Sequence, residues 1–167
     1  MFFRLFLTLI LVNFSLVSFP KIVRSETPDE WVQLGRRIHG GFGSYVAMGI
    51  RIGLDAMEKL EAKPGELTVI YQDGQFTPCP CVADGLMIAT GATPGQNSLK
   101  VVPSTVNIKT FGVAILKNKK TGRSLQYILP LSTRSQLDTW NENLTERERY
   151  DAVMNAPADD LFSVKID

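Results

Sequence analysis

The stretch TPCPCVADGLMIATGATPGQ, residues 77–96, contains both cysteines of the chain, two residues apart around a proline. Its middle part has helical spacing from about Cys81, with Leu86 on the buried side. Gly91 is the expected end of that helix, and the proline and glycine that follow predict a loop. The stretch therefore predicts a short helix that begins at a cysteine.

Two helices are predicted before this stretch. The first, residues 26–38, opens with TPDE, in which a threonine N-cap and a glutamate three residues later form a capping box. The glycine-rich HGGFG then favours a turn. The second helix, residues 44–62, is expected to begin with Ser44 as its cap and carries apolar residues at helical spacing. Gly49 and Gly53 lie on one side of it, which indicates close backbone approach to another element.

The remaining segments predict a sheet and two more helices. Residues 67–72 are apolar and β-prone and predict a central strand. Residues 106–118 and 123–130 flank a polar turn and predict a β-hairpin. Two polar helices, 133–142 and 145–155, and a short strand-like tail follow. Because helices and strands are partly segregated along the chain, the predicted class is α+β: a single domain in which an antiparallel sheet with a hairpin is packed by helices.

Composition limits the classes of function. The chain has 167 residues, 44% hydrophobic and 21% charged, which suits one domain with a hydrophobic core. Three of its 18 basic residues and none of its 17 acidic residues lie in residues 1–25, so the body carries a formal net charge of −2. Nucleic-acid binding requires Lys and Arg that neutralise phosphates. A mildly acidic body without a basic cluster argues against that class.

The N-terminus predicts export. One early charge precedes an apolar run from Leu5 to about Phe19, which is typical of a signal peptide and short for a membrane span of about 20 residues. Ser25 is a compact residue suited to the cleavage position. We therefore expect residues 1–25 to be a signal peptide, or alternatively an uncleaved N-terminal anchor. Residues 26–167 are then a periplasmic or secreted domain.

The roles of Cys79 and Cys81 are open at this point. An exported pair is usually oxidised, but a bridge between residues two apart constrains almost no chain entropy, so a stabilising structural disulfide is the weakest explanation. As metal ligands, the two thiolates would combine with the only histidine, His39, into a set that leaves one position open. As a reactive thiol, Cys81 would gain from the helix N-terminus, which favours the thiolate. Inert packing is the third possibility.

Three segments resemble the FmdE-like family, which takes its name from a component of formylmethanofuran dehydrogenase. They are HGGFGSYVAMGIR (39–51), CVADGLMIATGATPGQNSL (81–99) and RYDAVMNAPADDLFSV (149–164). The second is the most specific match. The resemblance implies an α+β core, usually dimeric, with a cleft where the histidine and cysteine segments meet. The residues that match the first two segments are His39, Gly40, Ala47, Gly49, Arg51, Cys81, Asp84, Thr90, Gly91, Thr93 and Gly95.

The chain also departs from the family pattern. Gly41 stands where a second histidine is usual, and Gly43 stands where a cysteine is usual. Cys79 is an additional cysteine relative to that pattern, and we expect it to substitute for the ligand that is missing at Gly43. Only part of the family's site is therefore retained in the sequence.

Other matching residues are candidates for ligand binding or for support of the site. Asp84 lies one helical turn after Cys81, where it could orient His39 or act as a carboxylate ligand; an ordinary first-turn acid is the alternative. Arg51 could bind an anionic ligand or pair with Asp55, four residues later. The loop candidates with exposed backbone donors are Thr90, Gly91 and Thr93.

We expect an exported family member that binds a metal ion or small cofactor in a cleft between the His39 loop and the Cys81 helix. The predicted metal ligands are His39, Cys79 and Cys81, with zinc or another transition metal as the ion. One alternative is a thiol-dependent enzyme that uses Cys81 with His39 as base. Another is a non-catalytic dimeric binding module with a degenerate site. The expected partners are a small-molecule ligand and a second copy of the chain, with membrane contact only through an uncleaved N-terminus.

Overall fold

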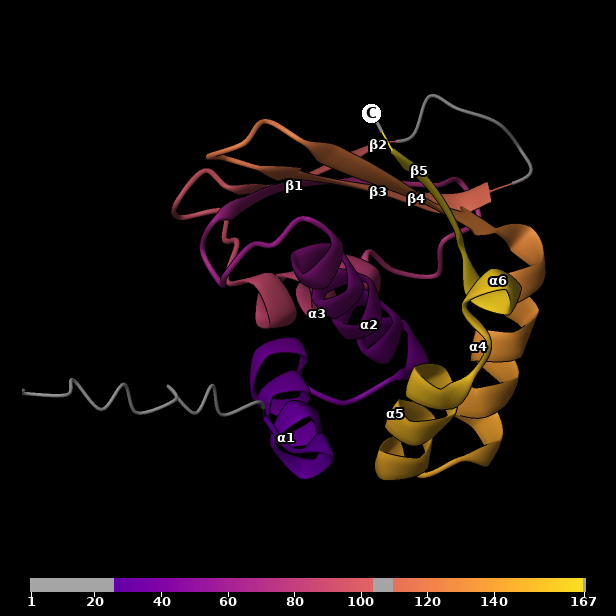
Figure 1. The fold of residues 1–167 in the computed structure, drawn as a ribbon. Coiled ribbons are helices and arrows are strands. Elements are labelled where there is room, and N and C mark those ends of the chain that lie inside the picture. The colour runs from indigo at the N-terminus through magenta and orange to yellow at the C-terminus, as the bar shows by residue number, and fades with distance from the viewer. Residues whose placement is uncertain (1–25, 104–109, 167) are drawn as a thin grey trace, which may run out of the picture.

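The computed structural model describes residues 26–103 and 110–166, and its helices lie on one side of a five-stranded sheet (Figure 1). The strands follow the order β2-β1-β3-β4-β5 across the sheet, and only β1 and β2 are parallel. Their bounds are β1 Leu67–Asp73, β2 Leu99–Pro103, β3 Thr110–Asn118, β4 Ser124–Pro130 and β5 Ser163–Ile166.

Six helices complete the described part of the chain and confirm the α+β class. Their bounds are α1 Pro28–His39, α2 Ser44–Lys59, α3 Cys81–Thr90, α4 Leu131–Asn143, α5 Glu146–Asn155 and α6 Ala158–Leu161. Figure 1 shows α2 and α3 directly beneath the sheet, α4 running away from the end of β4, and α1 and α5 farther from the sheet. Tyr71, Tyr127 and Leu86 are among the fully buried side chains of the core.

The predicted hairpin and tail strand are confirmed, but the sheet is mixed, which corrects the expected antiparallel sheet. Strand β2 pairs in parallel with β1 from Val69–Leu99 to Asp73–Pro103, and α3 is the connection between them. The sequence did not predict β2, because its five residues alternate poorly: only Leu99 is buried. Its strand conformation depends on β1, a partner about 30 residues earlier.

The first helix begins and ends where local chemistry places it. The Thr27 side chain accepts from the Glu30 backbone N–H, and the Glu30 carboxylate accepts from the Thr27 backbone N–H at 2.7 Å, which is the predicted capping box. After His39, Gly40 takes the left-handed conformation with φ of 87° and donates its N–H to the Arg36 carbonyl. The histidine is therefore the last residue of α1.

The expected close approach of α2 to another element is confirmed, and that element is α3. A Cβ added at Gly49 would lie 2.8 Å from the Gly85 Cα, and one added at Gly85 would lie 2.8 Å from the Gly49 Cα. A Cβ at Gly53 would lie 2.7 Å from the Ala89 Cβ. The two helices therefore touch backbone to backbone, which fixes the start of α3 relative to the loop before α2.

One local expectation is corrected, at the start of α2. Gly43 is the N-cap of α2, and Ser44 is its buried first residue, with the hydroxyl donating to the Leu137 carbonyl at 2.8 Å. The predicted signal peptide or anchor, residues 1–25, and residues 106–109 of the predicted hairpin lie outside the described residues. Among the helices of the described ranges, none combines the length and apolarity that a membrane crossing needs.

Candidate metal centre

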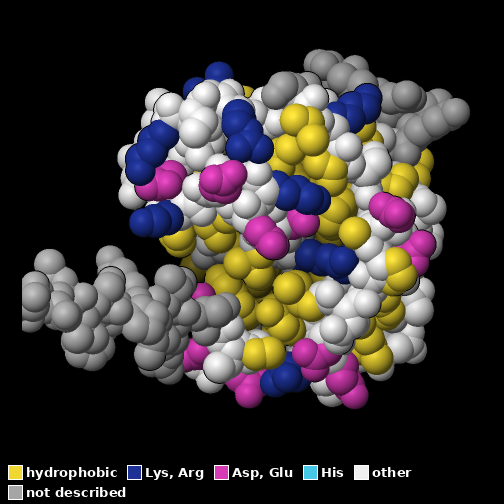
Figure 2. Space-filling model, in the orientation of Figure 1, with side chains coloured by type: hydrophobic (Ala, Val, Ile, Leu, Met, Phe, Trp, Pro, Cys, Tyr) yellow, Lys and Arg dark blue, Asp and Glu magenta, His cyan; other side chains and the backbone are white. Residues whose placement is uncertain are grey.

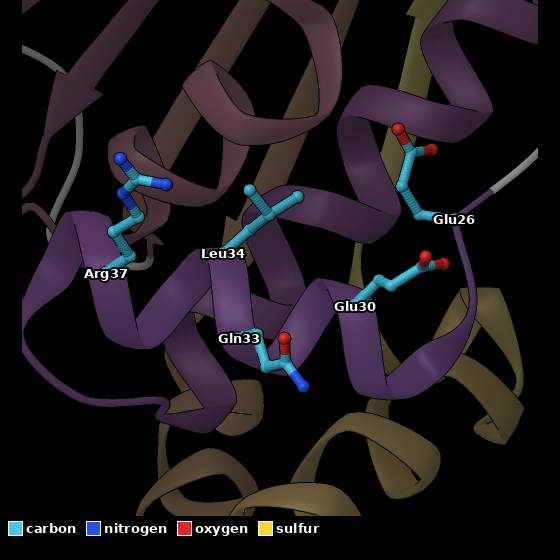
Figure 3. Close-up of a pocket in the computed structure, with 5 residues that line it drawn as sticks. All are labelled: Glu26, Glu30, Gln33, Leu34 and Arg37. Atoms are coloured by element: carbon cyan, nitrogen blue, oxygen red, sulfur yellow. The ribbon is translucent and has the colours of Figure 1, made fainter.

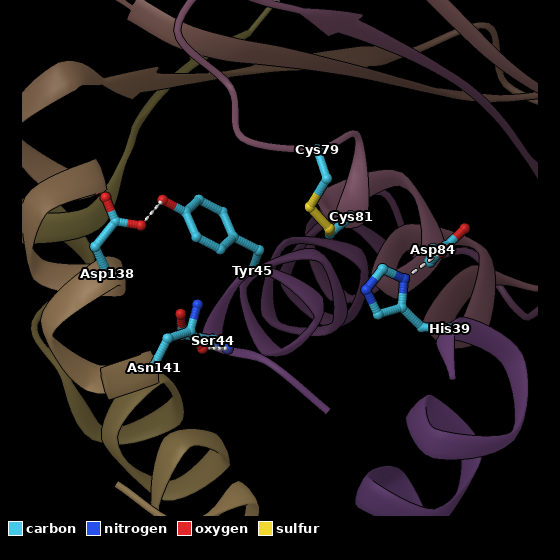
Figure 4. The surroundings of a disulfide bond; sticks show 8 residues. All are labelled: His39, Ser44, Tyr45, Cys79, Cys81, Asp84, Asp138 and Asn141. Carbon is cyan, nitrogen blue, oxygen red and sulfur yellow. Dashed lines mark hydrogen bonds and ion pairs between the residues drawn. A yellow bond between two sulfur atoms is a disulfide. The ribbon is translucent and has the colours of Figure 1, made fainter. Parts of the chain in front are cut away.

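Three soft or borderline metal ligands meet between α1 and α3. One ligand atom from each of His39, Cys79 and Cys81 lies within 4.8 Å of the others. His39 comes from the last position of α1, Cys79 from the loop before α3, and Cys81 from the first position of α3. Figure 4 shows the imidazole ring directed toward the two sulfurs. The fold thus brings together residues that are about 40 positions apart in sequence.

The two sulfurs are joined in a disulfide, the state that the sequence favoured least, so that expectation is corrected (Figure 4). Pro80 turns the chain at the N-cap of α3 and places the two Cα atoms 5.2 Å apart, within the usual range for a bridge. The bridge closes only a three-residue loop, for which the chain-entropy model gives roughly 1.6 kcal/mol. The fold does not depend on so local a link.

Asp84 holds the His39 ring. The Asp84 carboxylate lies one helical turn after Cys81 and accepts from His39 Nδ1 at 2.7 Å. A carboxylate acceptor at Nδ1 keeps the proton there and leaves Nε2 free as an acceptor or metal ligand. Both side chains are about one-third exposed, at 29% for His39 and 37% for Asp84. The interaction therefore acts mainly through the orientation of the ring.

Of the three ligands, His39 also borders a hollow of about 420 Å³, whose lining includes neither cysteine. Its wall combines the glycine loop between α1 and α2 with polar side chains from α4 and α5, and its residues are His39, Gly40, Gly41, Phe42, Gly43, Asn141, Glu146 and Arg149. A Cβ at Gly41 would meet nothing within 4 Å, and one at Gly43 would lie 3.2 Å from Asn141 Oδ1. Gly41 therefore leaves open space in the loop after His39, whereas Asn141 already fills the space beside Gly43.

Polar contacts join α4 to the start of α2 beside this hollow. Asn141 Oδ1 accepts from the Ser44 N–H at 2.8 Å, and Tyr45 Oη donates to Asp138 at 2.6 Å (Figure 4). Burial and the bond to Asp138 raise the pKa of Tyr45, so its hydroxyl stays protonated. Sequence reasoning missed these residues because they lie on α4 and on a buried turn of α2, and no local spacing connects them to the cysteines.

The other predicted site residues lie elsewhere and have structural partners. The Arg51 guanidinium donates to the Val153 carbonyl and lies 5.7 Å from the centre of the Phe162 ring. Asp55, its expected partner, instead accepts from Lys59 and Tyr127.

The loop candidates are at the far end of α3. Thr90 is buried and donates to the Leu86 carbonyl at 2.6 Å, and Gly91 is the left-handed C-cap of α3. Thr93 belongs to a turn that Ser98 closes. Of the predicted supporting residues, the structure places only Asp84 beside the cluster.

The rest of the described surface has no comparable grouping of metal ligands. Figure 3 shows a hollow along α1 whose lining contains neither cysteine nor histidine: Glu26, Glu30, Gln33, Leu34 and Arg37. Figure 2 shows Lys and Arg side chains interspersed with Asp and Glu over the visible face. Within residues 26–103 and 110–166, His39, Cys79 and Cys81 are the group suited to a metal.

Comparison with known families identifies the chain. The family model described as FmdE, Molybdenum formylmethanofuran dehydrogenase operon, matches residues 38–163. The chain belongs to the FmdE family. This confirms the resemblance carried by the histidine and cysteine segments, and both segments lie inside the matched range of this FmdE protein.

One curated relative carries a function in its name. It is a probable S-adenosyl-L-methionine-binding protein of Archaeoglobus fulgidus, 29% identical to this chain over 122 residues. The match covers 68% of this chain and 32% of the relative. The FmdE protein therefore spans about a third of the length of the relative that it matches.

Proposed function

We propose that this FmdE protein binds a transition metal ion, with zinc as the first candidate, through His39 and the thiolates of Cys79 and Cys81. The observation that carries the proposal is the placement of the three ligand atoms within 4.8 Å of one another by two separate segments. Two thiolates and an imidazole are a donor set that zinc accepts. Asp84 supports it by fixing the tautomer and orientation of His39.

The hollow that His39 borders is the space in which a further ligand of the metal could lie. Three protein ligands leave a fourth position for water or a ligand atom, as in zinc sites that bind substrates. The glycine loop provides space there without side chains, and Asn141 and Arg149 contribute polar groups to the wall. A metal held by this set would act as a Lewis acid toward a group that enters the hollow.

The proposal is tested by zinc titration of the purified, reduced chain against a chromophoric chelator. We expect one ion per chain, and His39→Ala, Cys79→Ser and Cys81→Ser each to weaken binding by more than about 100-fold, since each removes a ligand rather than a supporting residue. Asp29→Asn is the matched control, because Asp29 is an exposed acid in the first turn of α1. This variant should bind zinc as the parent does. Parent protein that takes up no zinc when reduced would refute the proposal.

A second candidate function is binding of S-adenosyl-L-methionine in the same hollow. Two observations favour it: the function in the relative's name and the open, glycine-lined space beside His39. Equilibrium dialysis with labelled S-adenosyl-L-methionine tests it. Gly41→Leu should block the hollow and remove binding, because a Cβ at Gly41 points into open space, whereas Gly95→Leu is the matched control outside it. Equal binding by both variants would contradict this location.

We also propose that the protein is exported and forms a homodimer. The apolar N-terminal run supports export, and the family resemblance supports the dimer. Mass spectrometry of the protein from its host should give a chain that begins at or near Glu26. Light scattering should give about twice the mass of one chain. A full-length N-terminus in a soluble cell fraction, or a monomer at high concentration, would contradict the respective part.

A further inference from the structure

The same two sulfur atoms take part in two arrangements that exclude each other. Cys79 and Cys81 are joined in a disulfide, and both are members of the three-ligand group with His39. A sulfur in a disulfide carries no thiolate charge, and metal ions bind the thiolate. We infer that Cys79 and Cys81 form a reversible dithiol–disulfide couple whose reduced form alone holds the metal. The metal half of this inference rests on the proposed function.

The surrounding fold stays in place in both redox states. The bridge closes a three-residue loop, so its reduction releases little chain entropy. Val82 and Leu86 anchor α3 in the core with no exposed surface, and Gly49 packs against its backbone. His39 is held by Asp84, which is not part of the bridge. Reduction therefore leaves all three ligand atoms close together.

The two sulfurs differ in how a reductant reaches them. Cys79 is half-buried in the loop before α3, whereas Cys81 is 7% exposed. An external thiolate therefore attacks Cys79 Sγ, and Cys81 is the leaving group. Cys81 leaves at the first position of a ten-residue helix, where unpaired backbone N–H groups and the dipole stabilise a thiolate. A good leaving group makes the exchange fast.

The reductant is a dithiol, which supplies the two electrons that reduction of the protein disulfide requires. Its first thiolate attacks Cys79 Sγ, the bond between the two protein sulfurs breaks, and Cys81 departs as a thiolate. Its second thiolate then attacks the mixed disulfide and releases Cys79, so the dithiol becomes a disulfide. Two electrons pass from the dithiol to the protein pair, and the two protons of the dithiol pass to solvent. A divalent ion then binds both thiolates and His39 without a change in its own charge.

Metal binding must then shift the redox equilibrium. An ion that binds only the reduced form stabilises it by mass action. At a free zinc concentration of about 1,000 times its dissociation constant, the equilibrium constant for reduction rises about 1,000-fold. For a two-electron couple, that factor raises the reduction potential by about 90 mV. Oxidation by a disulfide reverses the sequence and releases the ion.

The test equilibrates the purified chain in dithiothreitol buffers of graded redox ratio, with and without zinc. Reduced thiols are counted by alkylation and mass spectrometry, and zinc is measured on the fully reduced and fully oxidised forms. We expect the oxidised form to bind zinc at least about 100-fold more weakly than the reduced form. We also expect the reduction potential to rise by about 90 mV at a free zinc concentration of about 1,000 times the dissociation constant. Asp84→Asn retains both cysteines but weakens the metal site, so its zinc-dependent shift should be smaller.

The outcomes that contradict the redox control differ from the outcome that contradicts the proposed function. Equal zinc binding by the two forms would overturn the redox control and leave the proposed function standing. If neither the reduced nor the oxidised form binds zinc, both the redox control and the proposed function are refuted. A pair that cannot be reduced, or whose reduction is insensitive to zinc that is bound, would also overturn the inference. Cys79→Ser cannot form the bridge, and its residual zinc binding should be unaffected by oxidant; circular dichroism checks that it folds.

Discussion

The substitution Gly49→Ala tests the backbone contact that positions α3, and with it Cys81. The added Cβ would lie 2.8 Å from the Gly85 Cα and 2.8 Å from the Leu86 nitrogen, and closer still to the Val82 carbonyl oxygen. Ordinary van der Waals contact begins near 3.4 Å. Backbone atoms cannot rotate away, so the two helices must separate.

The expected loss of stability follows from two opposing effects. Overpacking a well-packed core costs about 1–3 kcal/mol, and a clash with backbone belongs at the upper end of that range. Alanine in a helix interior is favoured over glycine by about 1 kcal/mol. We therefore expect the free energy of unfolding to fall by about 2 kcal/mol, or the midpoint temperature to fall by about 4–8 °C for a domain of this size.

Urea unfolding of the reduced, metal-free chain measures this effect, followed by circular dichroism and tryptophan fluorescence. Gly95→Ala is the matched control, because its added Cβ meets only the Thr93 hydroxyl at 3.9 Å. Gly85→Ala should destabilise like Gly49→Ala, and the double variant should lose less than the two losses combined, since one separation relieves both clashes. Stability of Gly49→Ala at or above that of the control would refute the proposed helix contact.

Three further predictions concern single polar side chains. Asp84→Asn should weaken zinc binding about 10–100-fold, measured by competition with a chelator, because the Asp84 carboxylate only orients the histidine. The urea midpoint of the zinc-free chain should stay unchanged. An unaltered zinc affinity would contradict that role. Tyr127→Phe should cost about 1–3 kcal/mol in urea unfolding, since its buried hydroxyl donates to Asp55 at 2.6 Å. An unaltered free energy of unfolding would contradict that bond. Burial raises the pKa of Asp73, so the contribution of this carboxyl to stability falls as the pH rises from the unfolded pKa of about 3.9 through the folded pKa. Asp73→Asn should therefore be more stable than the parent at pH 7, and this advantage should shrink toward pH 4. An advantage that grows on acidification would contradict the direction of the pKa shift.

Much of the fold followed from local signals. The capping box at Thr27 and Glu30 and the glycine after His39 gave the bounds of α1 to within two residues. The row of Gly49 and Gly53 correctly indicated a close helix contact, although it did not identify α3 as the partner. These signals are readable because they depend on residues within one or two helical turns of each other.

The candidate site followed from sequence only in part. His39, Cys81 and Asp84 were predicted from the segments that resemble the family, and the structure brings them together. The same segments contain Arg51 and Thr90, which the structure instead pairs with backbone carbonyls of Val153 and Leu86. A shared motif does not distinguish a ligand contact from a packing contact, because both constrain residue type.

By itself, the sequence determined the five longer helices, the capping box of α1, the hairpin, the α+β class and the family. These depend on short-range hydrogen bonds, backbone preferences and hydrophobic spacing, all of which are recorded along the chain. Only the tertiary structure decided that β2 pairs with β1, that Pro80 turns the two cysteines into a bridge, and that His39 lies beside them. The strand pairing joins residues about 30 positions apart, and the place of His39 depends on how α1 lies against α3, so no local pattern contains either outcome.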